Sequence, residues 1–212
     1  MSSAPRLTLE TLRQGARELR NRDARLGAWI ERIGDVGLRR HRHHFGALCR
    51  SIISQQLAAK AAQTIHGRFV DLFQPVRKAD PAQLLRIDVP RLRACGLSER
   101  KARYVRGLAR EFHEGTLRSA RLGSLGDEEV IERLTALDGI GRWTAEMFLI
   151  FSLGRLDVFS IGDLALRNGV ERVAGRKLKP EAIEKIAASW SPYRSVASLY
   201  LWRIAHWSAP QA

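Results

Sequence analysis

The chain of 212 residues is long enough to form one compact domain, or two small lobes, around a core that needs no disulfide or metal cross-link. It carries 36 Lys and Arg residues against 22 Asp and Glu residues, and a formal net charge of +14 attracts polyanions. Most of these cations are arginines, which can grip a phosphate with two parallel hydrogen bonds. Nucleic acid is therefore the first candidate partner, although an arginine-rich proteome would give the same composition.

The two cysteines, Cys49 and Cys95, lie in apolar helical patterns without paired spacing. This argues against a structural disulfide and against a cysteine-based zinc or iron-sulfur site, and it fits a reducing compartment.

No apolar run reaches the roughly 18 residues of a membrane span, and the N-terminus lacks the apolar core of a signal peptide. We expect an unprocessed intracellular protein without membrane association, DNA-associated and cytoplasmic if its source is bacterial.

Apolar residues recur at helical spacing along nearly the whole chain, beginning with Leu9, Leu12, Ala16 and Leu19, and no segment alternates as a strand. The pattern predicts an all-α protein of about ten helices. Gly115 suits the C-terminal end of one helix, Pro180 suits the first turn of another, and residues 194–207 are expected to form the last. Residues 155–162 are the least helical stretch after residue 148, and a crossing between lobes is expected there.

The segment LDGIGRWTAEM, residues 137–147, joins one helical apolar stripe to the next. Gly139 and Gly141 permit a positive φ or a close backbone approach, so the pattern indicates a helix, a hairpin and a second helix. Backbone amides at the start of the second helix, together with the helix dipole, form a site suited to phosphate. A simple corner between two helices is the alternative, because G-x-G alone is common.

Asp163 follows Gly141 by 22 residues and begins the apolar stripe of Leu164, Val170 and Val173. Aspartate is favoured as an N-cap, so a capping role and a catalytic role both remain open from spacing alone, and they are compatible.

The stretch from the hairpin to Asp163, LDGIGRWTAEMFLIFSLGRLDVFSIGDLALRNG, resembles the helix-hairpin-helix DNA glycosylases, and among them the AlkA-like 3-methyladenine DNA glycosylases. RSIISQQLAAKAA at 50–62, LRACGLSERKARYVRGLA at 92–109 and WSPYRSVASLYLW at 190–202 resemble the same branch, so the matches cover most of residues 45–207. The resemblance implies a single glycosylase unit, 1–212, with an all-α, two-lobed fold and a cleft between lobes. The expected lobes are 45–150, which carries the hairpin 137–144, and 1–44 with 155–212.

The resemblance also implies roles for individual residues. Asp163 becomes the catalytic carboxylate, and the base pocket is formed by Trp143, Met147 and Trp202, with Met147 standing where well-known relatives have a tyrosine. DNA is bound by the wedge Gln55, Gln56 and Leu57, with Gln56 as the plug, and by the hairpin residues Gly139, Gly141, Arg142 and Thr144. Read without the family, Met147 and Trp202 are ordinary core residues, and the two glutamines are solvent contacts at a helix end.

Three further expectations concern cofactors and chemistry. Relatives that also cut the DNA backbone carry a lysine where this chain has Trp143, so no Schiff-base lyase activity is expected. No cofactor is required, but the backbone carbonyls of Thr135, Leu137 and Ile140 are candidates to hold a structural Na⁺ or K⁺. HRHHF at 41–45 lacks the nearby carboxylate or cysteine of a metal site and is expected to be a basic surface segment.

The sequence therefore predicts a monomeric, monofunctional glycosylase that flips alkylated purines, such as 3-methyladenine and 7-methylguanine, out of duplex DNA and hydrolyses the N-glycosidic bond in base excision repair. Two departures from the family pattern keep alternatives open. Gly162 stands where relatives often have an acidic residue, and it could loosen the loop that carries Asp163. Asp138 stands where relatives often have a hairpin proline. Its negative charge would weaken phosphate binding unless it points away or Arg142 offsets it. The alternatives are a non-catalytic DNA-binding or damage-recognition module, and a glycosylase for oxidised or mismatched bases.

Overall fold

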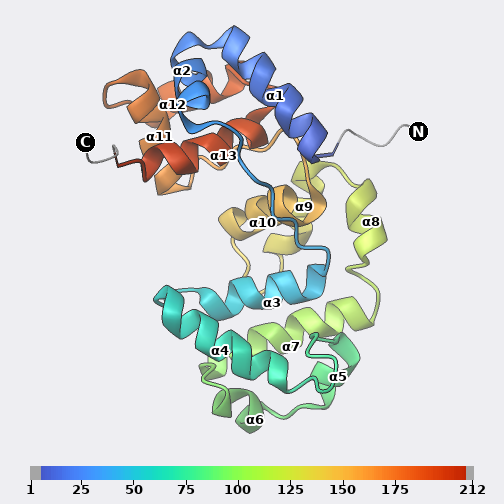
Figure 1. Cartoon of the computed structure of the whole chain (residues 1–212). Helices are drawn as coiled ribbons and strands as arrows, with labels where there is room; N and C mark the ends of the chain where they lie inside the picture. The colour runs from blue at the N-terminus through green and yellow to red at the C-terminus, as the bar shows by residue number, and fades with distance from the viewer. Residues whose placement is uncertain (1–5, 209–212) are drawn as a thin grey trace. The chain divides into compact units, whose positions relative to one another are not determined.

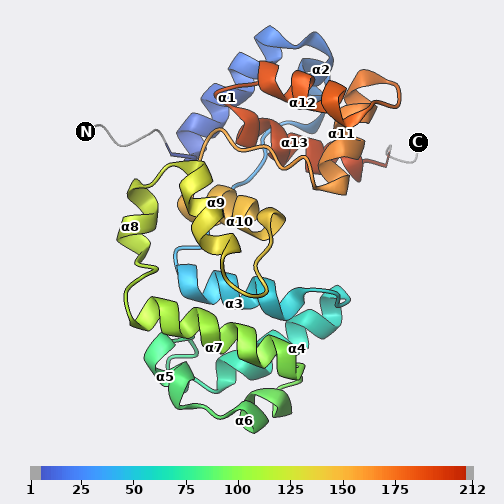
Figure 2. The same cartoon turned by 180° about the vertical axis from the view of Figure 1, so that it is seen from behind.

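The computed structural model describes residues 6–208, and within this range every extended element is helical (Figures 1 and 2). The described part of the chain forms thirteen α-helices and one π-helix, and its only β-type pairing is an isolated bridge between Arg6 and Arg155. The all-α prediction is confirmed. The number of helices exceeds the expected ten because α5, α6 and α8 have only six residues each, too few to show a helical period in the sequence.

The chain divides into two compact units, which we call the terminal unit, residues 1–40 and 149–212, and the central unit, residues 41–148. Residues 1–5 and 209–212, which the sequence assigns to a terminal lobe, lie outside the described residues. No helix between residues 6 and 208 is long and apolar enough to cross a membrane.

The central unit consists of eight helices: α3 (His44–Ser54), α4 (Ala59–Asp71), α5 (Pro81–Arg86), α6 (Val89–Ala94), α7 (Glu99–His113), α8 (Ser119–Ser124), α9 (Asp127–Thr135) and α10 (Arg142–Phe148). Helix α7 packs against α3, α5 and α6, while α9 and α10 form a helical hairpin (Figure 1). The long helices bury one apolar face each, including Leu48, Ile52, Phe69, Val105, Leu108, Val130 and Leu134. Gly115 has a φ of 83° just after the end of α7, as predicted for a helix C-terminus.

The terminal unit contains α1 (Leu9–Arg22), α2 (Ala24–Ile33), the π-helix η1 (Leu149–Leu153), α11 (Leu164–Ala174), α12 (Pro180–Ser189) and α13 (Arg194–Ala205). Helix α13 is the centre of this unit because it packs against α1, α2 and α11 and is buried on most sides (Figure 2). A Cβ atom at Gly169 would lie 2.6 Å from the carbonyl oxygen of Leu201, so glycine permits the close contact between α11 and α13. Asp163 and Trp202 are carried by these two tightly packed helices.

Two smaller predictions for the terminal unit are also confirmed. Pro180 is the first residue of α12, where its missing N–H leaves no helical hydrogen bond unmade. Residues 155–162 form no helix, as their sequence indicated. The last helix ends at Ala205, two residues before the predicted end.

Candidate active site and nucleic-acid interface

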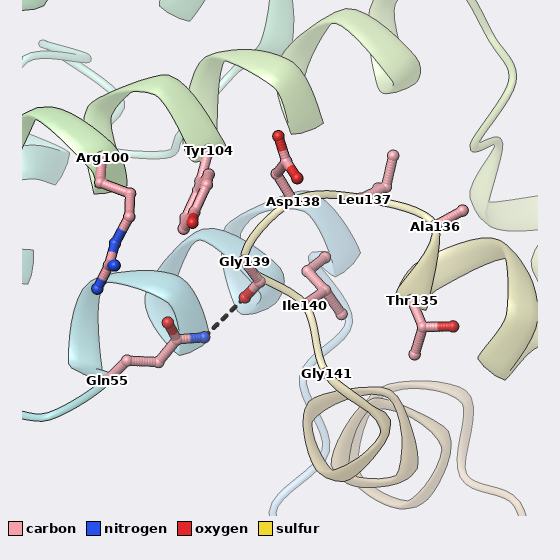
Figure 3. Close-up of a pocket in the computed structure, with 10 residues that line it drawn as sticks. All are labelled: Gln55, Arg100, Tyr104, Thr135, Ala136, Leu137, Asp138, Gly139, Ile140 and Gly141. Carbon is pink, nitrogen blue, oxygen red and sulfur yellow. Dashed lines mark hydrogen bonds between the residues drawn. The ribbon is translucent and has the colours of Figure 1, made fainter.

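Residues 136–141 connect α9 to α10 in the hairpin that the sequence predicted (Figure 3). Gly139 has a φ of 84°, and a Cβ atom added there would lie 2.3 Å from the ring of Tyr104 on α7. Glycine is therefore required at this position for both its backbone conformation and the close approach of α7. The turn is closed by a hydrogen bond of 3.2 Å from the Ile140 amide to the Leu137 carbonyl, and the Ile140 side chain is buried.

Gly141 has a different environment from Gly139. No atom lies within 4 Å of the place where its Cβ would stand, so its backbone is open to a ligand. It immediately precedes α10, and its carbonyl accepts the first helical hydrogen bond, from the Ala145 amide. The side chain of Thr144 is buried, which means that this predicted DNA-binding residue could reach a phosphate only through its backbone amide.

Arg142, the first residue of α10, is held by two carboxylates. It donates two hydrogen bonds to Glu128 on α9, at 2.7 Å and 3.1 Å, and one of 3.0 Å to Glu146, whose side chain is buried. The hydrogen bond from Arg142 lowers the pKa of Glu128, and Glu128 in turn raises the pKa of Arg142. The hydrogen bonds and ion pairs of Arg142 in the described part of the chain are to Glu128 and Glu146 rather than to Asp138. The arginine instead joins α9 to α10 beside the hairpin.

The predicted wedge lies at the end of α3 and is fastened to both the hairpin and α7. The amide nitrogen of Gln55 donates a hydrogen bond of 2.7 Å to the Gly139 carbonyl (Figure 3). The ammonium group of Lys101 on α7 donates to the carbonyls of Ile53 and Gln55, at 2.7 Å each. Gln56 follows with a φ of 56°, unusual for a residue with a side chain, and is exposed. Gln56 therefore lies exposed in a turn that hydrogen bonds hold to the hairpin and to α7. The next residue, Leu57, is also exposed.

A pocket of about 460 Å³ lies against the hairpin and contains many of the predicted residues. Its lining comprises Gln55, Arg100, Tyr104, Thr135, Ala136, Leu137, Asp138, Gly139, Ile140 and Gly141 (Figure 3). The three residues proposed as cation ligands through their carbonyls are among them.

The histidines of segment 41–45 do not line this pocket. His44 packs edge-on against Phe148, and burial lowers the pKa of His43.

Asp163 is buried at the N-terminus of α11 in the terminal unit. Its Oδ1 accepts a hydrogen bond of 2.9 Å from the Leu166 amide, so the capping role anticipated from the sequence is present. The preceding turn is fixed by the Asp163 amide, which donates to the Ser160 carbonyl, and by Arg167, which donates to the Ile161 carbonyl. Gly162 has no positive φ, and its Cβ position is open, so neither conformation nor packing requires glycine there.

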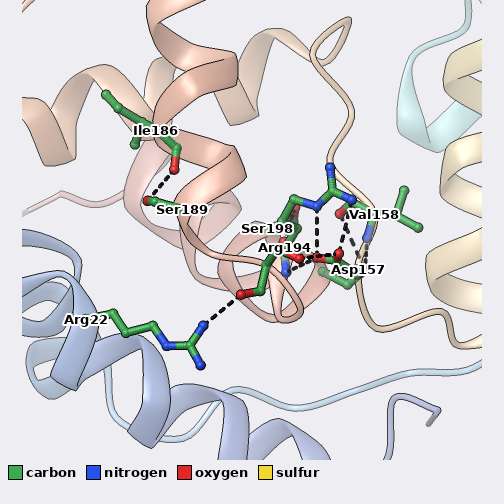
Figure 4. Close-up of polar contacts among 9 residues, drawn as sticks. Arg22, Asp157, Val158, Ile186, Ser189, Arg194 and Ser198 are labelled. Carbon is green, nitrogen blue, oxygen red and sulfur yellow. Dashed lines mark hydrogen bonds and ion pairs between the residues drawn. The ribbon is translucent and has the colours of Figure 1, made fainter. Parts of the chain in front are cut away.

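The segment before Asp163 is tied to the start of α13. The Val158 amide donates to the hydroxyl of Ser195, and the Ser195 amide donates to the Leu156 carbonyl. Asp157 accepts hydrogen bonds from Arg194, as shown in Figure 4. The loop that leads to Asp163 is therefore held at both ends by hydrogen bonds within the terminal unit.

The aromatic candidates differ in exposure. Trp143, on α10 in the central unit, is 50% exposed, whereas Met147 on the same helix is half-buried. Trp202, on α13 in the terminal unit, is half-buried and packs against Phe151, with ring centroids 5.5 Å apart. Trp143 is therefore more exposed than a core residue.

Four residues with clear positions at the site were not singled out from the sequence: Tyr104, Lys101, Asp157 and Arg194. Lys101 and Tyr104 lie in the stretch LSERKARY, which resembles the family but predicts no role for either residue. Nothing in the local pattern indicates that Lys101 reaches the end of α3 or that Tyr104 packs under Gly139.

Comparison with known proteins identifies the family. Residues 49–193 match the family model of the HhH-GPD superfamily of base excision DNA repair proteins. The chain belongs to this superfamily. It is 38% identical to DNA-3-methyladenine glycosylase 1 of Schizosaccharomyces pombe over 74% of this chain and 70% of that protein.

Two solved structures are similar over nearly the whole chain. The DNA-3-methyladenine glycosidase of Bacillus halodurans has a TM-score of 0.84 at 39% identity, covering 91% of this chain and 89% of that one. The 3-methyladenine DNA glycosylase Mag1 of Schizosaccharomyces pombe, in complex with abasic DNA, has a TM-score of 0.79 at 32% identity, covering 90% and 95%. The resemblance to helix-hairpin-helix DNA glycosylases is thereby confirmed.

Proposed function

We propose that this HhH-GPD protein is a monofunctional DNA glycosylase that excises alkylated purines, of the 3-methyladenine and 7-methylguanine type, from duplex DNA in base excision repair. The observation that carries the proposal is the buried carboxylate of Asp163 at the start of α11, in a chain whose relatives are named as 3-methyladenine glycosylases. We further propose that it acts as a monomer on DNA inside the cell.

Asp163 is the catalytic residue of this proposal. Cleavage of the bond between base and sugar develops positive charge on the sugar, and a buried carboxylate stabilises that charge more strongly than an exposed one. The same carboxylate can orient or deprotonate the attacking water. A purine methylated at N3 or N7 already carries positive charge and leaves readily, so one carboxylate suffices where most glycoside hydrolases use two.

In this proposal, base capture is assigned to Trp143 and Met147 on α10 and to Trp202 on α13. Electron-rich indole rings stack favourably on a cationic, electron-poor purine, and Trp143 is half exposed. Met147 is flexible and polarizable, which suits a pocket that accepts more than one alkylated base. Because residue 143 is a tryptophan, the hairpin offers no lysine amine at this position to form a Schiff base, and hydrolysis without strand cleavage follows.

Duplex DNA is held by the open backbone at Gly141 and the following amides, a site suited to phosphate because of the helix dipole. Gln56 fills the space that the flipped nucleotide leaves, and its amide can hydrogen-bond the unpaired partner base.

The hairpin also fits the monovalent cation that relatives suggest. The carbonyls of Thr135, at the end of α9, and of Leu137 and Ile140, in the hairpin, are neutral oxygen ligands, and all three residues line the same pocket. The Leu137 carbonyl accepts one hydrogen bond, from Ile140, and a carbonyl oxygen has a second lone pair to offer. A Na⁺ or K⁺ bound by these carbonyls would supply positive charge between the hairpin and a DNA phosphate.

The test is release of free 3-methyladenine and 7-methylguanine from methylated duplex DNA by the wild-type protein and by Asp163→Asn. Asparagine keeps a side-chain oxygen for the Leu166 amide, so the variant retains the helix cap while losing the charge. We expect release by the wild type and its loss in the variant, with duplex affinity retained.

Three other outcomes contradict the proposal. Undiminished release by Asp163→Asn would remove Asp163 from catalysis. Tight duplex binding by a wild type that releases no base would indicate a non-catalytic recognition module. Release of oxidised or mismatched bases in preference to methylated purines would contradict the proposed substrate class.

A further inference from the structure

Helix α7 carries a row of exposed arginines that the proposed mechanism does not use. Arg100, Arg103 and Arg110 are all exposed, and their spacings of three and seven residues place them along one side of the helix. With a rise of 1.5 Å per residue, the row spans about 15 Å, which corresponds to several phosphates of a DNA strand at about 3.4 Å of axial rise each.

These arginines have at most one weak ion pair among them in the described part of the chain. Arg100 and Arg110 have no ion pair among residues 6–208, and Arg103 has only a long, exposed contact of 3.6 Å with Glu99. Arg106 on the same helix, by contrast, donates to the carbonyls of Leu85 and Ile87. An anion can therefore bind the three exposed arginines without breaking a strong internal ion pair.

The row begins at the hairpin itself. Tyr104 packs under Gly139, and Arg100 lines the hairpin pocket on the same side as Gln55 (Figure 3). A second pocket, of about 510 Å³, lies between α7 and hairpin residues 136–138 and is lined by Arg100, Arg103 and Arg110. Arg100, Tyr104 and residues 136–138 line both pockets, so the α7 pocket adjoins the hairpin pocket that includes Gly141.

Two carboxylates share this second pocket, Glu111 and Asp138. Asp138 stands on the side of the hairpin that faces α7 rather than beside Gly141 (Figure 3). Three cations against two carboxylates leave the groove positive, and the carboxylates limit its affinity for phosphate. The groove is therefore suited to a salt-sensitive contact that can be released, not to a tight anion site.

We propose that Arg100, Arg103 and Arg110 form a second phosphate-binding stretch for duplex DNA, continuous with the hairpin. The inference rests on the proposed function as a DNA-binding glycosylase and extends its DNA interface along α7. Because the contacts are to phosphates, they add affinity without reading sequence or lesion.

The experiment measures the affinity for an undamaged duplex over a range of salt concentrations. We would compare the wild type, the three single Arg→Gln variants, the triple variant and a triple Arg→Lys variant. Each lost phosphate contact should reduce the slope of log affinity against log salt by about 0.9, so the triple Gln variant should lose between two and three units. The triple Lys variant should restore most of the slope because phosphate attraction depends mainly on charge.

The matched control is Arg93→Gln on α6, an exposed arginine of the central unit away from the hairpin pockets. Thermal unfolding of every variant excludes loss of folding as the cause. An unchanged slope in the folded triple Gln variant would overturn the proposal, as would an equal loss in Arg93→Gln.

Single-turnover release of 3-methyladenine at saturating protein separates this inference from the proposed function. We expect the triple Gln variant to reach the wild-type rate at saturation and to fall below it only at limiting protein concentration. A lower rate at saturation would contradict a purely phosphate-binding role. If the triple Gln variant loses the predicted two to three units of slope but the wild type releases no base, the α7 proposal is supported and the glycosylase proposal is contradicted.

Discussion

The guanidinium of Arg194 donates two parallel hydrogen bonds to the carboxylate of Asp157, at 2.8 Å from Nε and 3.1 Å from a terminal nitrogen (Figure 4). The Ser191 hydroxyl and the Arg194 amide donate to the same carboxylate. Arg194 begins α13, the helix of Trp202, while Asp157 lies six residues before Asp163. The ion pair therefore links the loop that leads to the proposed catalytic carboxylate with the helix that carries a proposed pocket residue.

This relationship predicts a pH-dependent loss of stability in Asp157→Asn. Burial alone would raise the pKa of Asp157, but the hydrogen bonds from Arg194 and Ser191 and the charge of Arg194 outweigh burial and lower it. A lowered pKa in the folded state stabilises the protein above the ordinary pKa of aspartate, and this contribution disappears as the pH falls through the folded-state value. We expect a loss of about 1 to 2 kcal/mol in the free energy of unfolding at neutral pH, and a smaller loss in acid.

Denaturant unfolding at several pH values measures this difference. Asp35→Asn is the control, because its carboxylate is exposed and contacts Arg13 at 3.5 Å, and it should change stability little. A difference between wild type and Asp157→Asn that stays constant down to strongly acidic pH would contradict the prediction.

The two roles of Asp163 can be separated by comparing alanine with asparagine. Asp163→Ala removes the side-chain acceptor for the Leu166 amide and should lower stability by about 1 kcal/mol, whereas Asp163→Asn should keep most of that contribution. Both variants should lose base release. Equal stability of the two variants in thermal unfolding would mean that the cap contributes little.

The two hairpin glycines should respond in opposite ways to alanine. Gly139→Ala forces a Cβ against Tyr104 at a positive φ and should cost about 2 kcal/mol or more of stability. Gly141→Ala meets no neighbouring atom and should leave stability within about 0.5 kcal/mol of the wild type. Its methyl group nevertheless projects into open backbone space, so duplex affinity should fall. Unchanged affinity of folded Gly141→Ala would contradict a phosphate contact at this position.

Trp143→Ala should separate base capture from DNA binding. Because Trp143 is 50% exposed, its removal should lower thermal stability less than removal of a fully buried tryptophan such as Trp190. Loss of stacking, about 1 to 3 kcal/mol per base, should slow release of 3-methyladenine about tenfold or more while affinity for undamaged duplex stays close to that of the wild type. Val76→Ala, at an exposed apolar residue, is the control. A wild-type rate of release would exclude Trp143 from the pocket.

Glu128→Gln should increase affinity for duplex DNA. The substitution weakens the paired hydrogen bonds that hold Arg142 and leaves this arginine more available to a phosphate. We expect a gain of about two- to fivefold at low salt. Glu132→Gln, on the same helix with the same change in charge, is the control. An equal gain in both variants would show that net charge, rather than release of Arg142, is responsible.

The local sequence predicted the elements whose signals lie within a few residues. Gly139 and Gly141 indicated the hairpin, Asp163 indicated both a cap and a candidate carboxylate, and Pro180 and Gly115 indicated helix ends. Each of these depends on backbone geometry or on a hydrogen bond within one helical turn, which a single sequence can reveal. Their agreement with the structure follows from that locality.

Contacts between distant segments could not be predicted in this way. The Gln55 amide reaches the Gly139 carbonyl across 84 residues of chain, and Arg194 reaches Asp157 across 37. Nothing in the sequence indicated that tertiary packing brings Glu128 and Glu146 to Arg142. Exposed arginines and glutamines have many possible partners, and only the packed helices decide among them.

The hydrogen bond between Gln55 and Gly139 gives the hairpin and the neighbouring Gln56 a fixed spacing. Lys101 secures the same turn from α7, so Gln56 cannot shift along the hairpin without breaking several contacts. In the proposed complex, the distance between the hairpin and Gln56 is fixed. A phosphate bound at the hairpin therefore determines between which base pairs Gln56 inserts. As the protein slides along DNA, Gln56 would then probe one nucleotide after another. The probed nucleotide would always lie at the same distance from the phosphate at the hairpin, whether or not its base is damaged.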